Sequence, residues 1–100
     1  MRRSLQIDAA QYVIIDALLG ETFFISLGTS IRKLRVKNVS PGQLYVFVYK
    51  QDHVGGHTVA WGADIRNTTP IDPTPNSTTI QSCIADTGGI LKANLPGTVA

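Results

Sequence analysis

Residues 43–51 read Gln-Leu-Tyr-Val-Phe-Val-Tyr-Lys-Gln and follow the turn sequence Ser40-Pro41-Gly42. Successive side chains of a β-strand point to opposite faces. One face of this stretch is therefore aliphatic and the other aromatic: Leu44, Val46, Val48 and Tyr45, Phe47, Tyr49. Because both faces are apolar, either the strand lies between two packed layers or another subunit covers one of its faces. On the second interpretation, the candidate oligomer interface is Tyr45, Phe47 and Tyr49.

The rest of the chain is also rich in strand-forming residues. Val, Ile and Thr account for 28 of the 100 residues and Glu occurs once, and β-branched residues pack well on a pleated sheet. Turn residues separate most of the candidate strands, which are Gln11–Leu19, Glu21–Leu27, Ile31–Asn38, Gln43–Gln51, His57–Trp61, Ser77–Ala85 and Ile90–Asn94. This spacing predicts an all-β fold, a single-domain antiparallel β-sandwich or jelly roll of about seven to eight strands.

One predicted strand has an alternative. Residues 8–19 begin at Asp8, a common helix N-cap, and end before Gly20, so they also fit a capped helix. Against a helix, Val13-Ile14-Ile15 places three β-branched residues in a row, which crowds the preceding helical turn. We favour the strand, and the sequence leaves both conformations open.

Composition and length bound the class of protein. One hundred residues make one domain, for which we expect a short N-terminal arm at 1–9, the sandwich at 10–94 and a C-terminal tail at 95–100. The net charge of +2 is too small to indicate nucleic-acid binding. No apolar run approaches the roughly 20 residues of a membrane span, and no signal sequence follows Met1-Arg2-Arg3. We therefore expect a protein made in the cytoplasm, with neither nucleic acid nor a membrane as its partner.

Few residues suggest chemistry. Cys83 is the only cysteine, which excludes an internal disulfide, and we expect it to be a small buried residue. Asp52, His53 and His57 lie close together, but a metal site needs three or four converging ligands, and exposed turn residues explain this group more simply. The sequence has no Gly-x-Ser-x-Gly nucleophile motif. We expect no enzyme activity, no catalytic or metal-binding residues and no cofactor.

A cationic strand face is the clearest candidate for partner contact. In Ile31–Asn38, Leu34 and Val36 alternate with basic residues, so one face of this strand is half-buried and the other cationic. Two further arginines lie near the N-terminus, on an arm that we expect to become ordered on binding. The candidate interface, suited to an acidic protein surface, consists of Arg2, Arg3, Lys33, Arg35 and Lys37.

The central segment resembles a known module. Pro41–Asp52 is followed by Gly55-Gly56-His57-Thr58-Val59-Ala60-Trp61-Gly62 and then by Ile65-Arg66. This run is similar to a β-rich module of tailed-bacteriophage virion proteins, which occurs in fibres, spikes and capsid-attached appendages. The resemblance extends from Ala10 to Asn94, although the last predicted strand lacks the aromatic residues often found there.

The resemblance implies a non-enzymatic structural protein of the virion. Because the module begins close to Met1 and ends close to Ala100, the main expectation is a capsid cement or decoration protein. It would be a homotrimer that binds the major capsid protein and stabilises the shell. One alternative is a small tail- or head-fibre receptor-binding protein. Another is a carbohydrate-binding module, for which Trp61 is the supporting residue.

Overall fold

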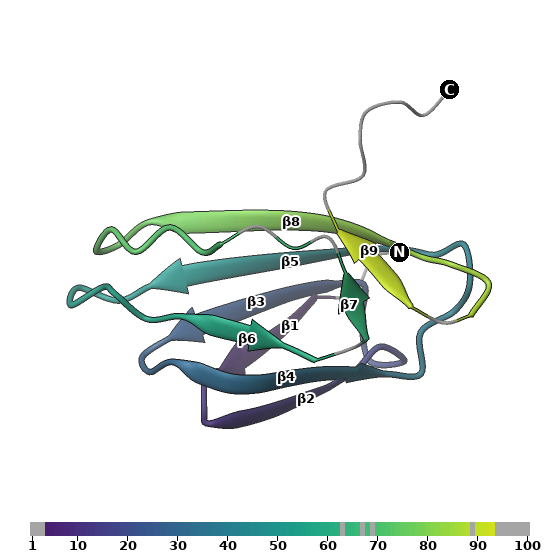
Figure 1. The fold of residues 1–100 in the computed structure, drawn as a ribbon, viewed down its shortest axis with the longest axis horizontal. Coiled ribbons are helices and arrows are strands. Elements are labelled where there is room, and N and C mark those ends of the chain that lie inside the picture. Colours follow the sequence, from purple (N-terminus) through teal and green to yellow (C-terminus); the bar gives the residue numbers. More distant parts are fainter. Residues whose placement is uncertain (1–3, 63, 67, 69, 89, 94–100) are drawn as a thin grey trace.

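The computed structural model describes residues 4–62, 64–66, 68, 70–88 and 90–93. These residues contain no helix and form strands β1 (Ser4–Asp8), β2 (Tyr12–Asp16), β3 (Thr22–Leu27), β4 (Ile31–Lys37), β5 (Leu44–Gln51), β6 (Val59–Trp61), β7 (Ile65–Arg66), β8 (Thr78–Ala85) and β9 (Leu91–Ala93). The larger sheet has the order β1-β3-β5-β8-β9-β7, and the smaller has the order β2-β4-β6. The two sheets pack as two layers, which confirms the predicted all-β sandwich (Figure 1).

The direction of strand pairing differs from the prediction. Only β5–β8 and β8–β9 are antiparallel among the pairs of the described strands, and the pairs β1–β3, β3–β5, β2–β4, β4–β6 and β7–β9 are parallel. The physical reason is the path of the chain, which alternates between the sheets from β1 to β6. Each visit to the opposite sheet reverses the chain once on the way out and once on the way back, so neighbouring strands of one sheet run the same way.

The aromatic face of β5 forms the centre of the core. Tyr45, Phe47 and Tyr49 are buried within the single chain, with Phe47 at 0% exposure, and Phe47 stacks on Phe23 with ring centroids 5.2 Å apart. The assignment of Tyr45, Phe47 and Tyr49 as an oligomer interface is therefore wrong. These side chains belong to the buried core cluster of the chain, where no second subunit can reach them.

Residues 4–16 contain one confirmed strand and one missed strand. Residues 12–16 form β2, with Val13 and Ile15 buried and Ile14 exposed, so the strand interpretation of this segment is correct. Residues 4–8, expected to belong to a free arm, form β1 and pair with β3. Leu5 and Ile7 pack against the core, which explains why this segment joins the sheet. Arg2 and Arg3 of the expected arm and the tail at 95–100 lie outside the described residues.

Candidate functional site: the loop end beside Trp61

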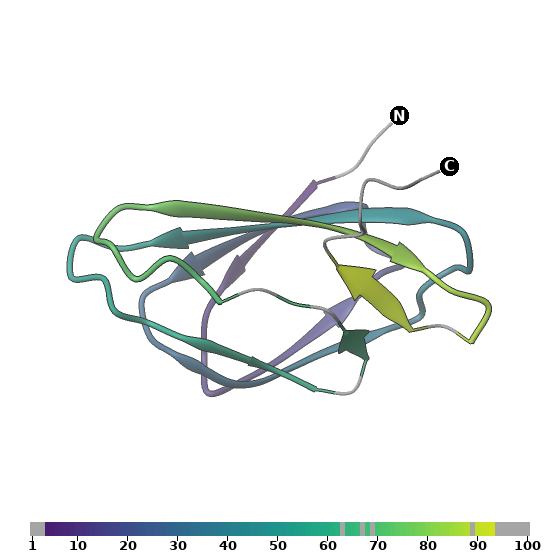
Figure 2. The same cartoon turned by 45° about the horizontal axis from the view of Figure 1, so that its top comes forward.

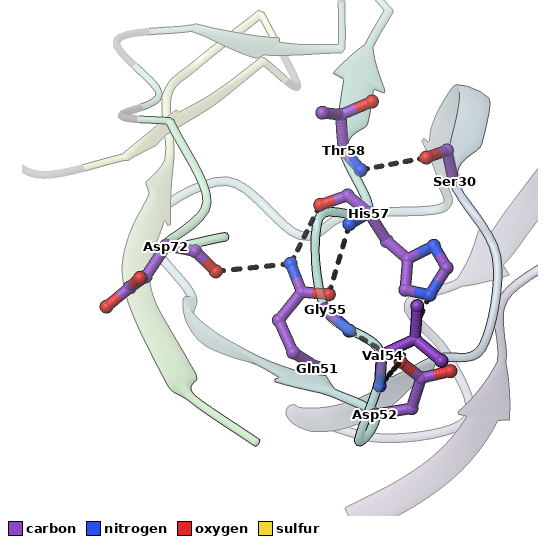
Figure 3. Close-up of polar contacts among 8 residues, drawn as sticks. All are labelled: Ser30, Gln51, Asp52, Val54, Gly55, His57, Thr58 and Asp72. Atoms are coloured by element: carbon purple, nitrogen blue, oxygen red, sulfur yellow. Dashed lines mark hydrogen bonds and ion pairs between the residues drawn. The ribbon is translucent and has the colours of Figure 1, made fainter. Parts of the chain in front are cut away.

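The loops before β6 and before β8 lie side by side at one end of the sandwich (Figures 1 and 2). Gln51, the last residue of β5, has its side chain between them and is 1% exposed. Its amide nitrogen donates to the carbonyl oxygens of His57 (2.8 Å) and Asp72 (3.1 Å), and its Oε1 accepts from the His57 N–H (3.3 Å; Figure 3). One buried side chain thus links the end of β5 to both loops.

Asp52 shapes the first of these loops. Its carboxylate accepts hydrogen bonds from the backbone N–H groups of Gly55 and Val54, both at 3.0 Å, and lies 3.1 Å from His57 Nε2 (Figure 3). The hydrogen bond from the Gly55 N–H is the main reason why the pKa of Asp52 lies below its ordinary value. Val54 and His57 lower this pKa further. His53 is exposed, and the described residues contain no cluster of three His, Cys, Asp or Glu that could hold a metal ion.

The second loop packs directly against the first. Gly56 N–H donates to the Pro73 carbonyl oxygen at 2.8 Å, and Asn76 N–H donates to that of Asp52 at 2.9 Å. Gly55 has a φ of +73°, and a Cβ added there would lie 2.7 Å from the Pro73 oxygen. Only a residue without a side chain allows the two backbones to approach this closely. The loop end is therefore held together by main-chain contacts as well as by Gln51.

A groove runs beside these loops. It encloses about 300 Å³ and is lined by Thr58, Val59, Trp61, Thr68, Pro70 and Ile71. Trp61 is partly exposed, and its Nε1–H donates to the Tyr49 hydroxyl at 3.0 Å. Its ring meets that of Tyr49 edge to face, at an interplanar angle of 84°. Burial raises the pKa of Tyr49, so its hydroxyl stays protonated and Trp61 keeps an uncharged partner.

The predicted row of cations lies exposed on β4, but acidic neighbours partly neutralise its positive charge. Lys33, Arg35 and Lys37 all lie exposed on the outer face of β4. Arg35 Nε, however, contacts the Asp64 carboxylate at 2.5 Å, and Lys37 lies opposite Asp16 in the register of β2 and β4. The hydrogen bond from the Arg35 guanidinium is the main reason why the pKa of Asp64 is lowered. Lys33 also acts electrostatically on Asp64, so each of the three cations has an acidic neighbour within the chain.

The outer face of the larger sheet is apolar at its centre. Phe24 lies opposite Val48, and Val48 lies opposite Ile80, which makes one row across three strands. Phe24 is 42% exposed and Ile80 is 61% exposed. Gln6, Lys50 and Thr78 border this row and line a groove of about 400 Å³ together with Phe24, Ile25, Ser26 and Val48. The more exposed face of β5 is thus the one with Leu44, Val46 and Val48, not the aromatic face that the sequence analysis considered for an interface.

Acid is expected to destabilise the fold. The pKa values of five carboxyl groups are lowered from the ordinary value of 3.8, namely those of Asp16, Asp52, Asp64, Asp72 and Asp86. A carboxyl group whose pKa is lower in the folded chain stabilises the fold above its unfolded pKa, and this contribution is lost as the pH falls through its folded pKa. The free energy of unfolding should therefore decrease below about pH 4.

Urea unfolding at about pH 7, 4 and 3 measures this decrease. The asparagine side chain of the Asp64→Asn variant cannot ionise. This variant should therefore be less stable than the unmodified chain at neutral pH, and it should lose less stability than the unmodified chain on acidification. Equal stability of the unmodified chain at neutral pH and at about pH 3 would contradict the prediction.

The sequence of residues 6–89 matches the model of a protein family described as "Putative phage tail fibre C-terminal domain". Because the match covers most of the chain, the protein belongs to this family. No curated protein and no solved structure matches the chain. Family membership confirms the resemblance to a β-rich phage virion module and supports a structural role in the phage particle. None of the described residues forms a helix long and apolar enough to cross a membrane.

Proposed function

We propose that this protein is the part of a phage tail fibre that contacts the host cell surface, and that it acts by binding without catalysis. The family match over residues 6–89 is the observation that carries the proposal, and it favours the fibre over the capsid cement expectation. The loop end supports the same function, because binding residues are commonly found on loops that a rigid scaffold positions. Here Gln51, Gly55 and Asp52 hold two loops against each other.

A competition experiment tests the proposal. The purified protein, added to host cells before the phage, should lower the rate of phage adsorption in a saturable manner. A phage that adsorbs through an unrelated receptor is the control and should be unaffected. If the protein neither binds the cells nor slows adsorption, the receptor-binding function is wrong.

The capsid cement function remains the second candidate, and a second measurement separates it from the first. Its support is the exposed row of Lys33, Arg35 and Lys37, which would face an acidic patch of the major capsid protein. Particles with and without the protein are heated in parallel and then tested for adsorption. On the fibre proposal, the particles lacking the protein keep their heat resistance and lose adsorption. Loss of heat resistance with normal adsorption would establish the cement function instead.

We further propose that copies of the chain assemble through the outer face of the larger sheet, as the homotrimer that the family resemblance implies. An apolar centre bordered by polar residues is typical of a subunit interface, and the row of Phe24, Val48 and Ile80 has this arrangement. A lysine at this centre would bury an unpaired charge. Ile80→Lys should therefore sediment as a monomer at micromolar concentration while the unmodified chain sediments as an oligomer.

Ile14→Lys is the matched control for this prediction. Ile14 is 67% exposed, close to the 61% of Ile80, and lies on β2 in the opposite sheet. This variant should assemble like the unmodified chain. A monomeric unmodified chain, or equal dissociation of the two variants, would show that the proposed face is not an interface.

A further inference from the structure

We propose that the groove beside Trp61 binds one neutral sugar unit of a surface glycan, with the indole ring as its stacking surface. This inference rests on the proposed host-contact function and names the ligand class. A sugar ring has apolar C–H faces and a rim of hydroxyl groups, so it needs an apolar platform next to uncharged hydrogen-bonding groups. The groove offers both, since Trp61, Val59, Pro70 and Ile71 are apolar, and Thr58 and Thr68 carry hydroxyls.

The charge of the groove limits the ligand class. Among the residues that the structure describes, the six that line the groove include no ionisable side chain. An acidic sugar or a phosphate would be buried here without a cation, which is unfavourable. A hexose, a deoxyhexose or an N-acetylhexosamine can instead donate to and accept from the hydroxyls of Thr58 and Thr68. The groove therefore suits a neutral sugar.

A hydrogen bond to the buried Tyr49 fixes the orientation of the Trp61 ring. Its Nε1–H is already donated to the Tyr49 hydroxyl, and Tyr49 is buried in the core with its hydroxyl 3.4 Å from Gln81 Oε1. The indole N–H therefore points inward, and the partly exposed remainder of the ring is its carbon surface. This surface can stack on the C–H groups of a sugar, and the hydroxyls of Thr58 and Thr68 can supply hydrogen bonds to the ligand.

The walls of the groove are held before any ligand arrives. Pro70 and Ile71 precede Asp72, whose carbonyl oxygen accepts from Gln51 Nε2 at 3.1 Å. Thr58, on the other wall, has its N–H bonded to Ser30 Oγ at 2.9 Å. A preformed site loses little conformational entropy on binding. The volume of about 300 Å³ is at the small end of ligand sites, so we expect millimolar affinity for a single sugar, strengthened by multivalency on the fibre.

Tryptophan fluorescence reports on this site directly, because Trp61 is the only tryptophan of the chain. The full chain is titrated with methyl glycosides of neutral hexoses, deoxyhexoses and N-acetylhexosamines. At least one of them should change the emission saturably. Thr68→Val removes one hydroxyl and keeps the shape of the side chain, and it should weaken binding by about fivefold to tenfold. Thr87→Val, an exposed substitution in the turn after β8, is the control and should bind normally.

Trp61→Leu completes the test, with binding followed by ligand-observed NMR and folding by circular dichroism. It should remain folded and lose detectable binding. If none of the glycosides binds the unmodified chain, or if both Trp61→Leu and Thr68→Val bind normally, the glycan site is wrong. The host-contact function still stands in that case if the protein slows adsorption. If the protein binds a glycoside through Trp61 but does not slow adsorption, the groove is a sugar site and the host-contact function fails.

Discussion

Phe47→Ala is expected to lower the free energy of unfolding by about 3–5 kcal/mol, the usual effect of deleting a buried phenylalanine ring. Phe47 is 0% exposed and stacks on Phe23 on one side and on Tyr49 on the other, with centroid distances of 5.2 and 6.5 Å. Its removal would leave a cavity between the two sheets. Because small domains are stable by only about 5–15 kcal/mol, the variant should be close to unfolding. Urea unfolding followed by circular dichroism measures the change.

Phe24→Ala is the matched control, because it deletes the same atoms from the opposite face of the same sheet. Phe24 is 42% exposed in the single chain and should lose less than about 1 kcal/mol when both substitutions are compared in the monomeric Ile80→Lys background, where the proposed interface contributes nothing. The pair also tests whether Phe47 belongs to the core of the chain. If Phe47→Ala remained as stable as the unmodified chain and lost only its assembly, Phe47 would be an interface residue after all.

The sequence pattern was sufficient to predict most strands, and in one of them also the buried face. In Ile31–Lys37, charged side chains alternate with Leu34 and Val36, and these two are buried as predicted. In β5 both faces are apolar, so the alternation identified two faces without deciding which one is inside. The missed strand β1 does alternate, with half-buried Leu5 and Ile7, and this signal was available. The two residues of β7 are too few for any pattern.

Strand direction could not be predicted from local turns. A short turn such as Gly28-Thr29-Ser30 fits a hairpin, in which the chain returns to the same sheet and pairs with itself. Here β3 precedes this turn in the larger sheet and β4 follows it in the smaller. The same local conformation therefore serves a different connection. Only the contacts between strands distant in sequence, such as Phe23 with Phe47, distinguish the two.

The candidate site could be predicted only in part, because its residues come from segments that are distant in the sequence. Asp52 and His57 stood out because they are near each other in the chain, and their contact serves to shape a loop. Trp61 was noticed alone, since Thr68 and Pro70 of its groove come from the loop before β8. Gln51 carried no signal, because a glutamine at the end of a strand is ordinarily exposed and here it is buried.

Gly55→Ala is expected to lower the free energy of unfolding by about 2–3 kcal/mol, from two independent causes. Gly55 has a left-handed φ of +73°, which L-residues with a side chain rarely adopt. A Cβ there would also lie 2.7 Å from the Pro73 oxygen and 2.8 Å from the Pro75 nitrogen. These are backbone atoms that the Gly56–Pro73 hydrogen bond holds in place, so the loops can relieve the clash only by separating. Urea unfolding measures the loss.

Gly56→Ala separates the two causes. Gly56 has nearly the same φ, +75°, but a Cβ there would meet no atom within 4 Å. This variant should lose only the backbone contribution, about 1 kcal/mol. The difference between the variants therefore measures the contact between the loops. Because the Pro70 wall of the groove belongs to the displaced loop, folded Gly55→Ala should also bind a glycoside ligand more weakly than Gly56→Ala does. Equal stability of the two variants would mean that the loops are not packed as closely as the fold requires, and the groove could not be preformed.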